Sequence, residues 1–154
     1  MALNVVLVEP EIPQNTGNIA RTCVVTSSAL HIIKPMGFSL DEKHIRRAGL
    51  DYWKDLELRT YDSIDELWQK YPDGVFLYFT TRAQKRFNEA DYPDGCFLVF
   101  GKETAGLEKR ILEGNKDRCV RIPMHGDQRC LNLSNAVCVA VYEALRANGY
   151  FDLK

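Results

Sequence analysis

The chain has little net charge, and neither sign dominates. Its 154 residues include 20 Lys and Arg and 21 Asp and Glu, which gives a formal net charge of −1 at pH 7. Proteins that bind nucleic acid through their overall charge carry a large excess of basic residues. The composition excludes that mode of binding, so an RNA ligand would have to be held by a local basic patch.

The chain also lacks cysteine pairs with the spacing of metal ligands. Its five cysteines are odd in number, no Cys-x-x-Cys pair occurs, and no histidine stands near them at metal-ligand spacing. Disulfide frameworks and zinc sites depend on such patterns. We therefore expect free thiols and no metal at these positions: Cys23, Cys96, Cys119, Cys130 and Cys138.

Long hydrophobic runs and a basic N-terminal region are missing as well. The apolar run 5–8 is far shorter than the roughly 20 residues that a membrane-spanning helix needs, and residues 1–4 carry no basic side chain. We expect no membrane segment and a cytoplasmic protein. A hydrophobic content of 45% over 154 residues fits a single domain covering residues 1–154.

Short apolar runs alternate with segments of helical periodicity. The apolar runs predict strands at residues 3–9, 30–34, 75–80, 96–100 and 119–122. The periodic segments predict helices at residues 19–28, 41–48, 63–71, 107–113 and 132–148. Nearly continuous apolar strands separated by helices indicate an α/β fold, with a mainly parallel sheet and helices on both faces.

Four loops follow predicted strands and should lie along the carboxyl edge of the sheet, where such sheets bind ligands: 10–17, 80–86, 101–107 and 123–131. In the first, Asn15 and Gly17 mark an expected helix start, where free N–H groups favour anions, and Arg21 follows one turn later. Plain helix capping with a surface arginine explains the same residues, and spacing alone favours it.

The other two loops that stand out leave similar alternatives open. Residues 101–107 contain two glycines, without the spacing of a dinucleotide fingerprint or a P-loop, so a simple turn and a ligand loop explain them equally well. Residues 123–131 are rich in polar side chains and precede good helix caps, which suits either a helix N-cap or the polar wall of a pocket. We expect His125 to be a solvated loop residue and not a general base.

The helix predicted at 132–148 is apolar around most of its circumference. Its apolar side chains form two stripes, Leu133, Val137, Val141 and Leu145, and the small residues Ala136, Ala140 and Ala144. Such a helix must be covered on more than one side. Burial within the monomer and a subunit interface both meet that requirement.

Basic residues gather in three segments, 43–47, 82–86 and 109–121. Such clusters are usually solvated faces, but the second and third follow strands at the same sheet edge. This placement predicts a weak RNA-binding track. Its candidate residues are Arg82, Lys85, Arg86 and Lys109.

Three motifs, in order and at fitting separation, resemble those of the SpoU (TrmH-like) branch of the SPOUT RNA methyltransferases. They are Asn-x-Gly-x-x-x-Arg at 15–21, Gly-x-Glu-x-x-Gly-Leu at 101–107, and Ile-Pro-Met at 122–124 followed by Asn-Leu-Ser-Asn at 132–135. Residues 9–21 and 46–52 are similar, more narrowly, to the tRNA wobble-nucleotide 2′-O-methyltransferases of that family. The resemblance covers essentially the whole chain.

The resemblance implies a SPOUT fold with a C-terminal trefoil knot, in which the segment after Ile122 passes through an earlier loop. Ordinary topology rules would not have suggested a knot. It also implies a homodimer packed through the first and last helices, and a site for S-adenosyl-L-methionine (SAM). The implied cofactor residues are Phe79, Gly101, Ile122 and Cys130, with Glu103, Gly106, Met124, Leu131 and Asn135 nearby. The family usually has serine where this chain has Cys130.

The implied reaction is methyl transfer from SAM to the ribose 2′-OH of the wobble nucleotide, cytidine or 5-carboxymethylaminomethyluridine at position 34, of leucine tRNAs. The motif arginine, Arg21, is the implied catalytic residue. An arginine in a protein stays protonated, so we expect it to clamp the adjacent phosphate and stabilise the developing alkoxide, with Asn15 holding it.

Two other functions are considered. A non-catalytic RNA-binding module is disfavoured because Arg21 and the 101–107 loop are intact. A SPOUT methyltransferase acting on another tRNA position, on rRNA or on a base nitrogen is disfavoured by the short chain and the narrow resemblance.

Overall fold

The structure is a computed structural model that describes residues 3–39, 53–126 and 130–154. Its core is a sheet of six parallel strands in the order β3-β2-β1-β5-β4-β6. The strands are β1 (Asn4–Val8), β2 (Ala29–Ile33), β3 (Leu58–Tyr61), β4 (Phe76–Phe79), β5 (Phe97–Phe100) and β6 (Cys119–Val120). The predicted parallel α/β sheet is confirmed.

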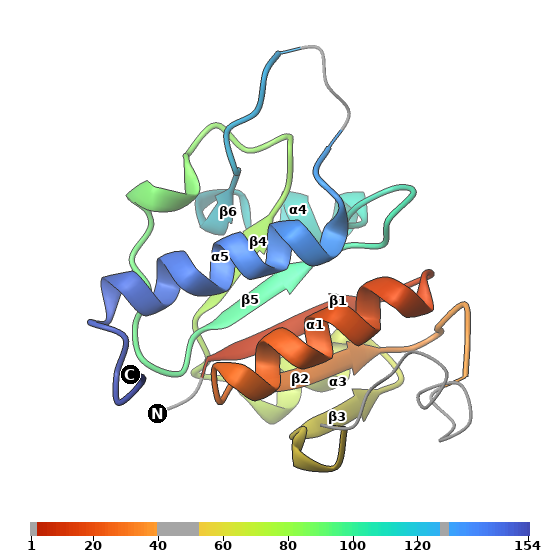
Figure 1. The fold of residues 1–154 in the computed structure, drawn as a ribbon. Coiled ribbons are helices and arrows are strands. Elements are labelled where there is room, and N and C mark those ends of the chain that lie inside the picture. Colours follow the sequence, from red (N-terminus) through yellow and green to blue (C-terminus); the bar gives the residue numbers. More distant parts are fainter. Residues whose placement is uncertain (1–2, 40–52, 127–129) are drawn as a thin grey trace.

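Helices cover both faces of this sheet. The α-helices are α1 (Pro13–Val25), α3 (Ile64–Lys70), α4 (Lys109–Glu113) and α5 (Leu133–Ala147), and the short 3-10 helices are η1 (Trp53–Asp55), η2 (Phe87–Glu89) and η3 (Lys116–Arg118). In Figure 1, α1 and α5 lie side by side on one face of the sheet, and α3 and α4 lie on the other. The helix predicted at 41–48 lies outside the described residues.

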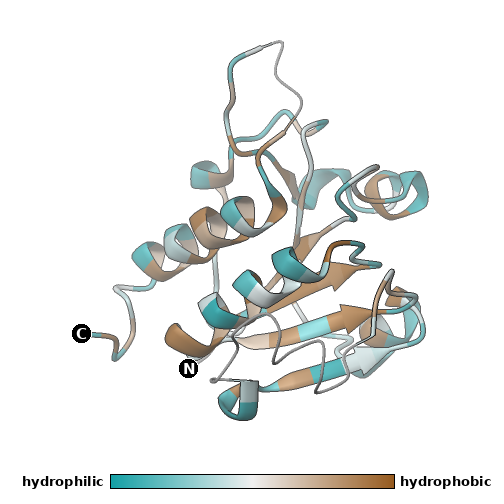
Figure 2. Ribbon diagram, turned by 45° about the vertical axis from the view of Figure 1, so that its right-hand side comes forward, coloured by the Kyte–Doolittle hydropathy of each residue, from teal (hydrophilic) through white to brown (hydrophobic). Residues whose placement is uncertain are grey.

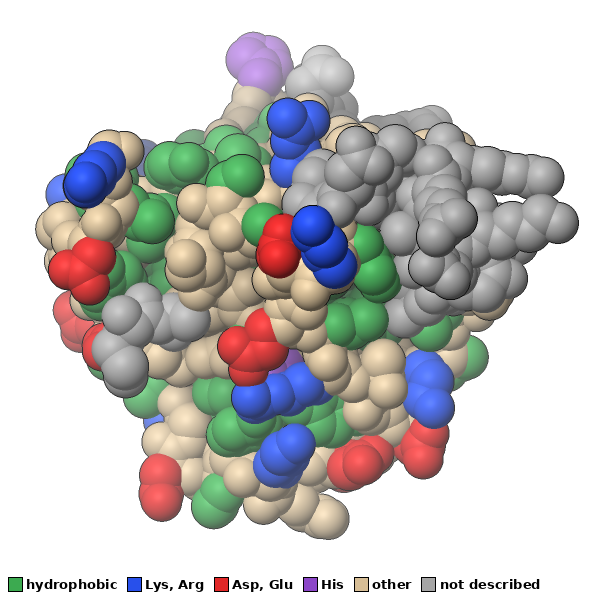
Figure 3. Space-filling model, turned by 60° about the horizontal axis from the view of Figure 1, so that its bottom comes forward, with side chains coloured by type: hydrophobic (Ala, Val, Ile, Leu, Met, Phe, Trp, Pro, Cys, Tyr) green, Lys and Arg blue, Asp and Glu red, His purple; other side chains and the backbone are tan. Residues whose placement is uncertain are grey.

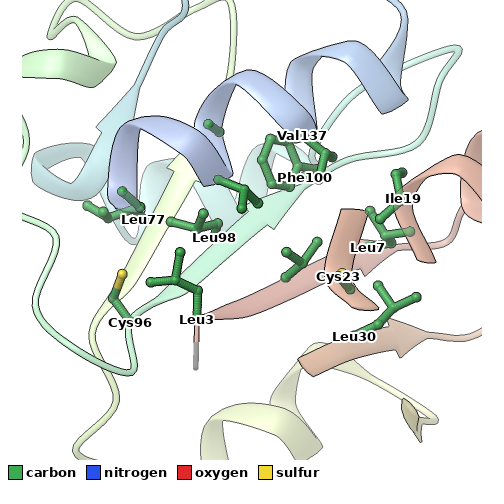
Figure 4. Packing of buried hydrophobic residues seen from close by; sticks show 14 of the residues in the cluster. Leu3, Leu7, Ile19, Cys23, Leu30, Leu77, Cys96, Leu98, Phe100 and Val137 are labelled. Carbon is green, nitrogen blue, oxygen red and sulfur yellow. The ribbon is translucent and has the colours of Figure 1, made fainter. Parts of the chain in front are cut away.

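Two hydrophobic cores, one on each face, explain why the strands are nearly continuous apolar runs. Leu7 and Leu98 point toward Ile19 of α1 and Val137 of α5 (Figure 4). On the other face the strand residues pack against α3 and α4, with Tyr78 almost fully buried. The strands are correspondingly hydrophobic in Figure 2, whereas the helices carry hydrophilic residues on their outer sides.

Some element boundaries differ from those predicted. Helix α1 begins at Pro13, whose fixed φ suits the first helical turn, so Asn15 is inside the helix and not its cap. Strand β3 was missed, because its sequence Leu-Arg-Thr-Tyr is only partly buried at the sheet edge and has no apolar run. Helix α3 is capped by Ser63, whose hydroxyl accepts a hydrogen bond from the Glu66 backbone N–H at 3.2 Å.

The small-residue stripe of α5 faces the core of its own chain. Ala140 and Ala144 are fully buried against the sheet, which decides between the two alternatives for this stripe. The outward face of α5 instead exposes Val139 (42%) and Tyr142 (46%), and α1 exposes Val25 (58%) on the same side of the sheet.

The five cysteines are free thiols, and burial raises the pKa of both the Cys23 and the Cys96 thiol to about 12. Within the described ranges no cluster of side chains could hold a metal ion. No helix in those ranges is long and apolar enough to cross a membrane. The trefoil knot stays a prediction.

Candidate active site

A cleft of about 850 Å³ opens at the carboxyl edge of the sheet. Its walls come from the segments that follow β4, β5 and β6 and from the first turns of α1 and α5, so the predicted convergence of these loops is confirmed. The volume falls within the range of small-molecule sites, roughly 300–1,000 Å³. The cleft also lies beside β1 and β5, where the strand order reverses, as expected for such sheets.

Most of the predicted cofactor residues line this cleft. They are Phe79, Gly101, Glu103, Gly106, Ile122, Met124, Cys130 and Leu131, and Asn15 joins them. Asn135 does not line the cleft; it is exposed on α5, where its backbone N–H points to Asn132 Oδ1 at 3.4 Å. Thr80 and Thr81 also line the cleft, and their position directly after β4 was the only sequence signal for them.

The apolar part of the wall is preformed. The Phe79 and Phe100 rings stack with centroids 4.7 Å apart. Ile12 and Leu131 line the cleft and remain 40% and 39% exposed, although both are large apolar side chains. Exposed apolar groups in a concave site are the surfaces that an apolar part of a ligand would cover.

Gly101 serves the loop's own fold. A Cβ at Gly101 would lie 2.0 Å from the carbonyl carbon of Gly106 and 2.2 Å from the Leu107 nitrogen, so no larger residue fits. Gly106 has φ +68° and open space around its α-carbon, so its role is conformational. Gly101 thus permits close approach of the loop to itself, and it also lines the cleft.

Glu103 binds the segment that precedes α1. Its carboxylate accepts hydrogen bonds from the backbone N–H groups of Glu11 at 2.8 Å and Ile12 at 3.0 Å, and from Asn15 Nδ2 at 3.3 Å. The favourable place for an anion near this helix N-terminus is therefore used by the chain's own carboxylate.

Asn15 connects α1 to α5. Its side-chain oxygen accepts a hydrogen bond from Asn132 Nδ2 at 3.0 Å, while Asn132 Oδ1 caps α5 by accepting from the Ser134 backbone N–H at 2.9 Å. The described hydrogen bonds of the Asn15 side chain thus go to Glu103 and Asn132. The first, second and third motifs of the sequence meet in this network.

The comparisons with known proteins agree with this geometry. Residues 2–142 match the SpoU rRNA Methylase family. The chain belongs to this family. A Geobacillus stearothermophilus relative is 51% identical over 99% of both chains. The Escherichia coli tRNA (cytidine(34)-2′-O)-methyltransferase is 49% identical, with 96% of this chain and 95% of that protein covered. A solved structure described as giving insight into 2′-OH methylation of C/U34 on tRNA has a TM-score of 0.90 at 42% identity, covering 96% of this chain and 97% of its own.

The SpoU motif arginine lies apart from the cleft of its own chain. Arg21 is exposed on α1 and does not line the cleft. Five residues of α1 lie between Asn15 and Arg21, so the two positions are about 9 Å apart along the helix axis and on different faces of the helix. The expectation that Asn15 holds Arg21 stays a prediction, and the described hydrogen bonds of the Asn15 side chain go to Glu103 and Asn132.

The predicted RNA-binding residues of this SpoU chain fall into two groups. Arg82 lines the cleft, and Lys85 and Arg86 follow in a segment whose backbone pairs with Arg121, through Arg121 N to Lys85 O at 2.9 Å. Lys109 instead lies on α4, where its ammonium is 3.6 Å from the Glu113 carboxylate. The basic segment 43–47 lies outside the described residues.

Charge is mixed on the face of the molecule that Figure 3 draws. Figure 3 shows one face on which basic and acidic side chains are interspersed, without a broad field of one sign. This matches a net charge of −1.

Proposed function

We propose that the chain is a SAM-dependent tRNA (cytidine(34)-2′-O)-methyltransferase whose 154 residues act as one domain in the cytoplasm. The observation that carries the proposal is the cleft at the carboxyl edge, because all three SpoU motifs contribute to its walls. Similarity over nearly the full length to a relative of that name supports the substrate.

The residues of the cleft fit SAM in their chemistry. The stacked Phe79 and Phe100 with Ile122 and Met124 offer apolar walls for an adenine ring, and the 101–107 backbone and Thr80 offer polar groups. When bound, SAM supplies a methyl group activated by a sulfonium. We assign its binding to Phe79, Gly101, Ile122, Cys130, Gly106, Met124 and Leu131, with Glu103 supporting the wall and Asn135 outside it.

Arg21 is assigned the catalytic role, across a homodimer. A guanidinium cannot act as a base, but it can clamp the phosphate beside the reacting ribose and stabilise the alkoxide that forms as the 2′-OH attacks. Because Arg21 is exposed and lies outside its own cleft, we infer that it acts in the cleft of the partner.

The outer faces of α1 and α5 form the proposed dimer surface. Each helix exposes one stripe at i, i+4, i+7 and i+11, consisting of Gln14, Asn18, Arg21 and Val25 on α1 and of Asn135, Val139, Tyr142 and Arg146 on α5. The two helices lie side by side on the same face of the sheet (Figure 1), so a partner that covers the apolar members of these stripes also contacts Arg21.

The wobble nucleotide suits a chain whose basic residues lie in local clusters. It lies in a single-stranded loop whose base can be splayed out and bound in a cleft. We assign binding of the RNA phosphate backbone to Arg82, Lys85, Arg86 and Arg121. Lys109 contributes less to this binding, because the Glu113 carboxylate lies close to its ammonium group. Leucine tRNAs are the proposed substrates.

The test is transfer of tritiated methyl groups from SAM to purified leucine tRNA, followed by digestion and mapping. We expect one alkali-resistant linkage, at nucleotide 34. A mark on a base, on another tRNA position or only on rRNA would reject the proposed substrate.

A further inference from the structure

Two loops hold each other through charged side chains at the edge of the cleft. Glu103, after β5, binds the backbone that precedes α1, as described above. In the opposite direction, Glu11 Oε1 accepts hydrogen bonds from the Thr104 backbone N–H at 3.1 Å and from the Thr104 hydroxyl at 2.7 Å. The chain thus contains a reciprocal pair of carboxylate contacts between the same two loops.

The two contacts differ in their surroundings. The Glu103 contact reaches partly buried groups, including the nearly buried Asn15 side chain. The Glu11 contact lies in solvent. The Thr104 hydroxyl, then the Thr104 backbone N–H and nearby Lys102, hold the pKa of the Glu11 carboxyl below its usual value. The Glu11 carboxyl is therefore ionised at neutral pH. Because the contact lies in solvent, removing it would not expose the hydrophobic core.

Glu11 and Thr104 lie next to the two parts of the proposed active site, the start of α1 and the wall of the cleft. Glu11 lies just before α1, the helix that carries Arg21, and Thr104 lines the cleft between Gly101 and Gly106. On its other side the Glu11 segment packs closely against Gly37. A Cβ atom added at Gly37 would lie 3.0 Å from the Glu11 carbonyl oxygen. The Glu11 segment is therefore held by Thr104 on one side and lies close to the Gly37 backbone on the other.

We propose that Glu11 and Thr104 are positioning residues for methyl transfer, whose contact fixes the cofactor wall of the cleft relative to the start of α1. The inference rests on the proposed function, because that wall is proposed to hold SAM and α1 to present Arg21. Neither side chain touches reacting atoms. Their contact couples occupancy of the cleft to the placement of the catalytic helix.

The test compares disruptive substitutions with conservative ones. Glu11→Ala and Thr104→Val remove the side-chain contact, whereas Glu11→Gln keeps an acceptor oxygen and Thr104→Ser keeps the hydroxyl. Affinity for S-adenosylhomocysteine, measured by calorimetry, should fall roughly 3- to 10-fold in the first two, the range expected for losing a typical hydrogen-bonded contact in solvent. It should stay near wild type in the second two, and kcat should fall only in the first two.

Two further variants make the test specific. Adding Thr104→Val to Glu11→Ala should weaken binding no further, because both substitutions remove the same contact. Glu113→Ala is the matched control for cofactor affinity, since it removes an exposed carboxylate from α4 that does not touch the loop, and it should leave S-adenosylhomocysteine binding unchanged. Equal losses in Glu11→Ala and Glu11→Gln, or fully additive losses in the double variant, would overturn the proposal.

Hydrogen exchange separates this inference from the proposed function. The Thr104 amide should exchange slowly in the wild type and in Glu11→Gln, and faster in Glu11→Ala, whatever reaction the protein catalyses. Equal protection in all three would show that the contact is not formed in solution. Failure of the wild type to bind S-adenosylhomocysteine would instead reject the proposed function.

Discussion

His31 is fully buried in β2 and is held by two polar partners. Its Nδ1 lies 2.9 Å from the Tyr61 hydroxyl and its Nε2 lies 2.9 Å from Asn4 Oδ1. Because Asn4 Nδ2 donates to the Gly95 carbonyl at 2.8 Å, Asn4 Oδ1 is an acceptor, which places the ring proton on Nε2. Burial, together with the positive charges of Arg59 and Lys70, lowers the pKa of His31 to about 4.

This burial predicts a loss of stability in mild acid. Between the unfolded pKa near 6.5 and the folded pKa near 4, the unfolded chain binds a proton that the folded chain does not, so the free energy of unfolding falls as pH falls. The His31 contribution should drop by about 2 kcal/mol between pH 7 and pH 5. Urea unfolding at both pH values measures it, and His31→Gln should remove this part of the difference. An equal pH dependence in both proteins would assign it to other groups.

At the scale of single residues, the motifs were predictable but some of their roles were not. Glu103 stood out as a motif residue near the cofactor, yet its partners at Glu11 and Ile12 are about 90 positions away in sequence. No periodicity connects such segments. Gly101 was likewise identified in the right loop, but its close contacts with Gly106 and Leu107 depend on how the loop folds back and could not be predicted.

At the scale of elements, burial decided what the sequence could predict. Strands β1, β2 and β5 are covered on both faces and were predicted to within about two residues at each end. The partly buried edge strand β3 was missed, and β6 is shorter than predicted because only Cys119 and Val120 pair with β4. The apolar residues around most of α5 indicated that the helix is buried on more than one side. Only the structure shows which of its stripes faces the sheet.

Helix α5 therefore predicts different outcomes for its two faces. Ala140→Arg would bury an unpaired charge against the sheet and should cost several kcal/mol, enough to unfold a marginally stable chain. Tyr142→Arg lies on the outward face and should leave the fold intact while weakening the dimer. Circular dichroism and light scattering separate these effects. A folded Ala140→Arg protein, or a wild type that is monomeric at micromolar concentration, would contradict the assignment.

At the scale of the whole molecule, one chain has the cleft but holds Arg21 outside it. The sequence motifs predicted both parts of the site, and the resemblance implied a dimer. Their separation within one chain could not be predicted, because it depends on which face of α1 each side chain occupies. This separation supports the proposed site shared between subunits.

Mixed dimers test the shared site. Arg21→Ala should abolish transfer, whereas Cys130→Trp adds bulk at an exposed position in the cleft and should block SAM without disturbing the core. Each variant alone should be inactive as a homodimer. Refolding the two together should restore activity, because mixed dimers combine one open cleft with one intact Arg21 from the partner. Absence of any recovery would place Arg21 in the cleft of its own chain.

The central claim is ribose methylation at the wobble position, and its most direct test is made in cells. Leucine tRNA from a strain lacking the gene is digested, and the ribose methylation of nucleotide 34 is measured by mass spectrometry. We predict that the mark is absent there and restored by the wild-type gene. Arg21→Ala should restore it slowly or not at all, since loss of one alkoxide-stabilising donor typically costs about 10²–10³-fold in rate. An unchanged level of 2′-O-methylation at nucleotide 34 in the deletion strain would contradict the claim.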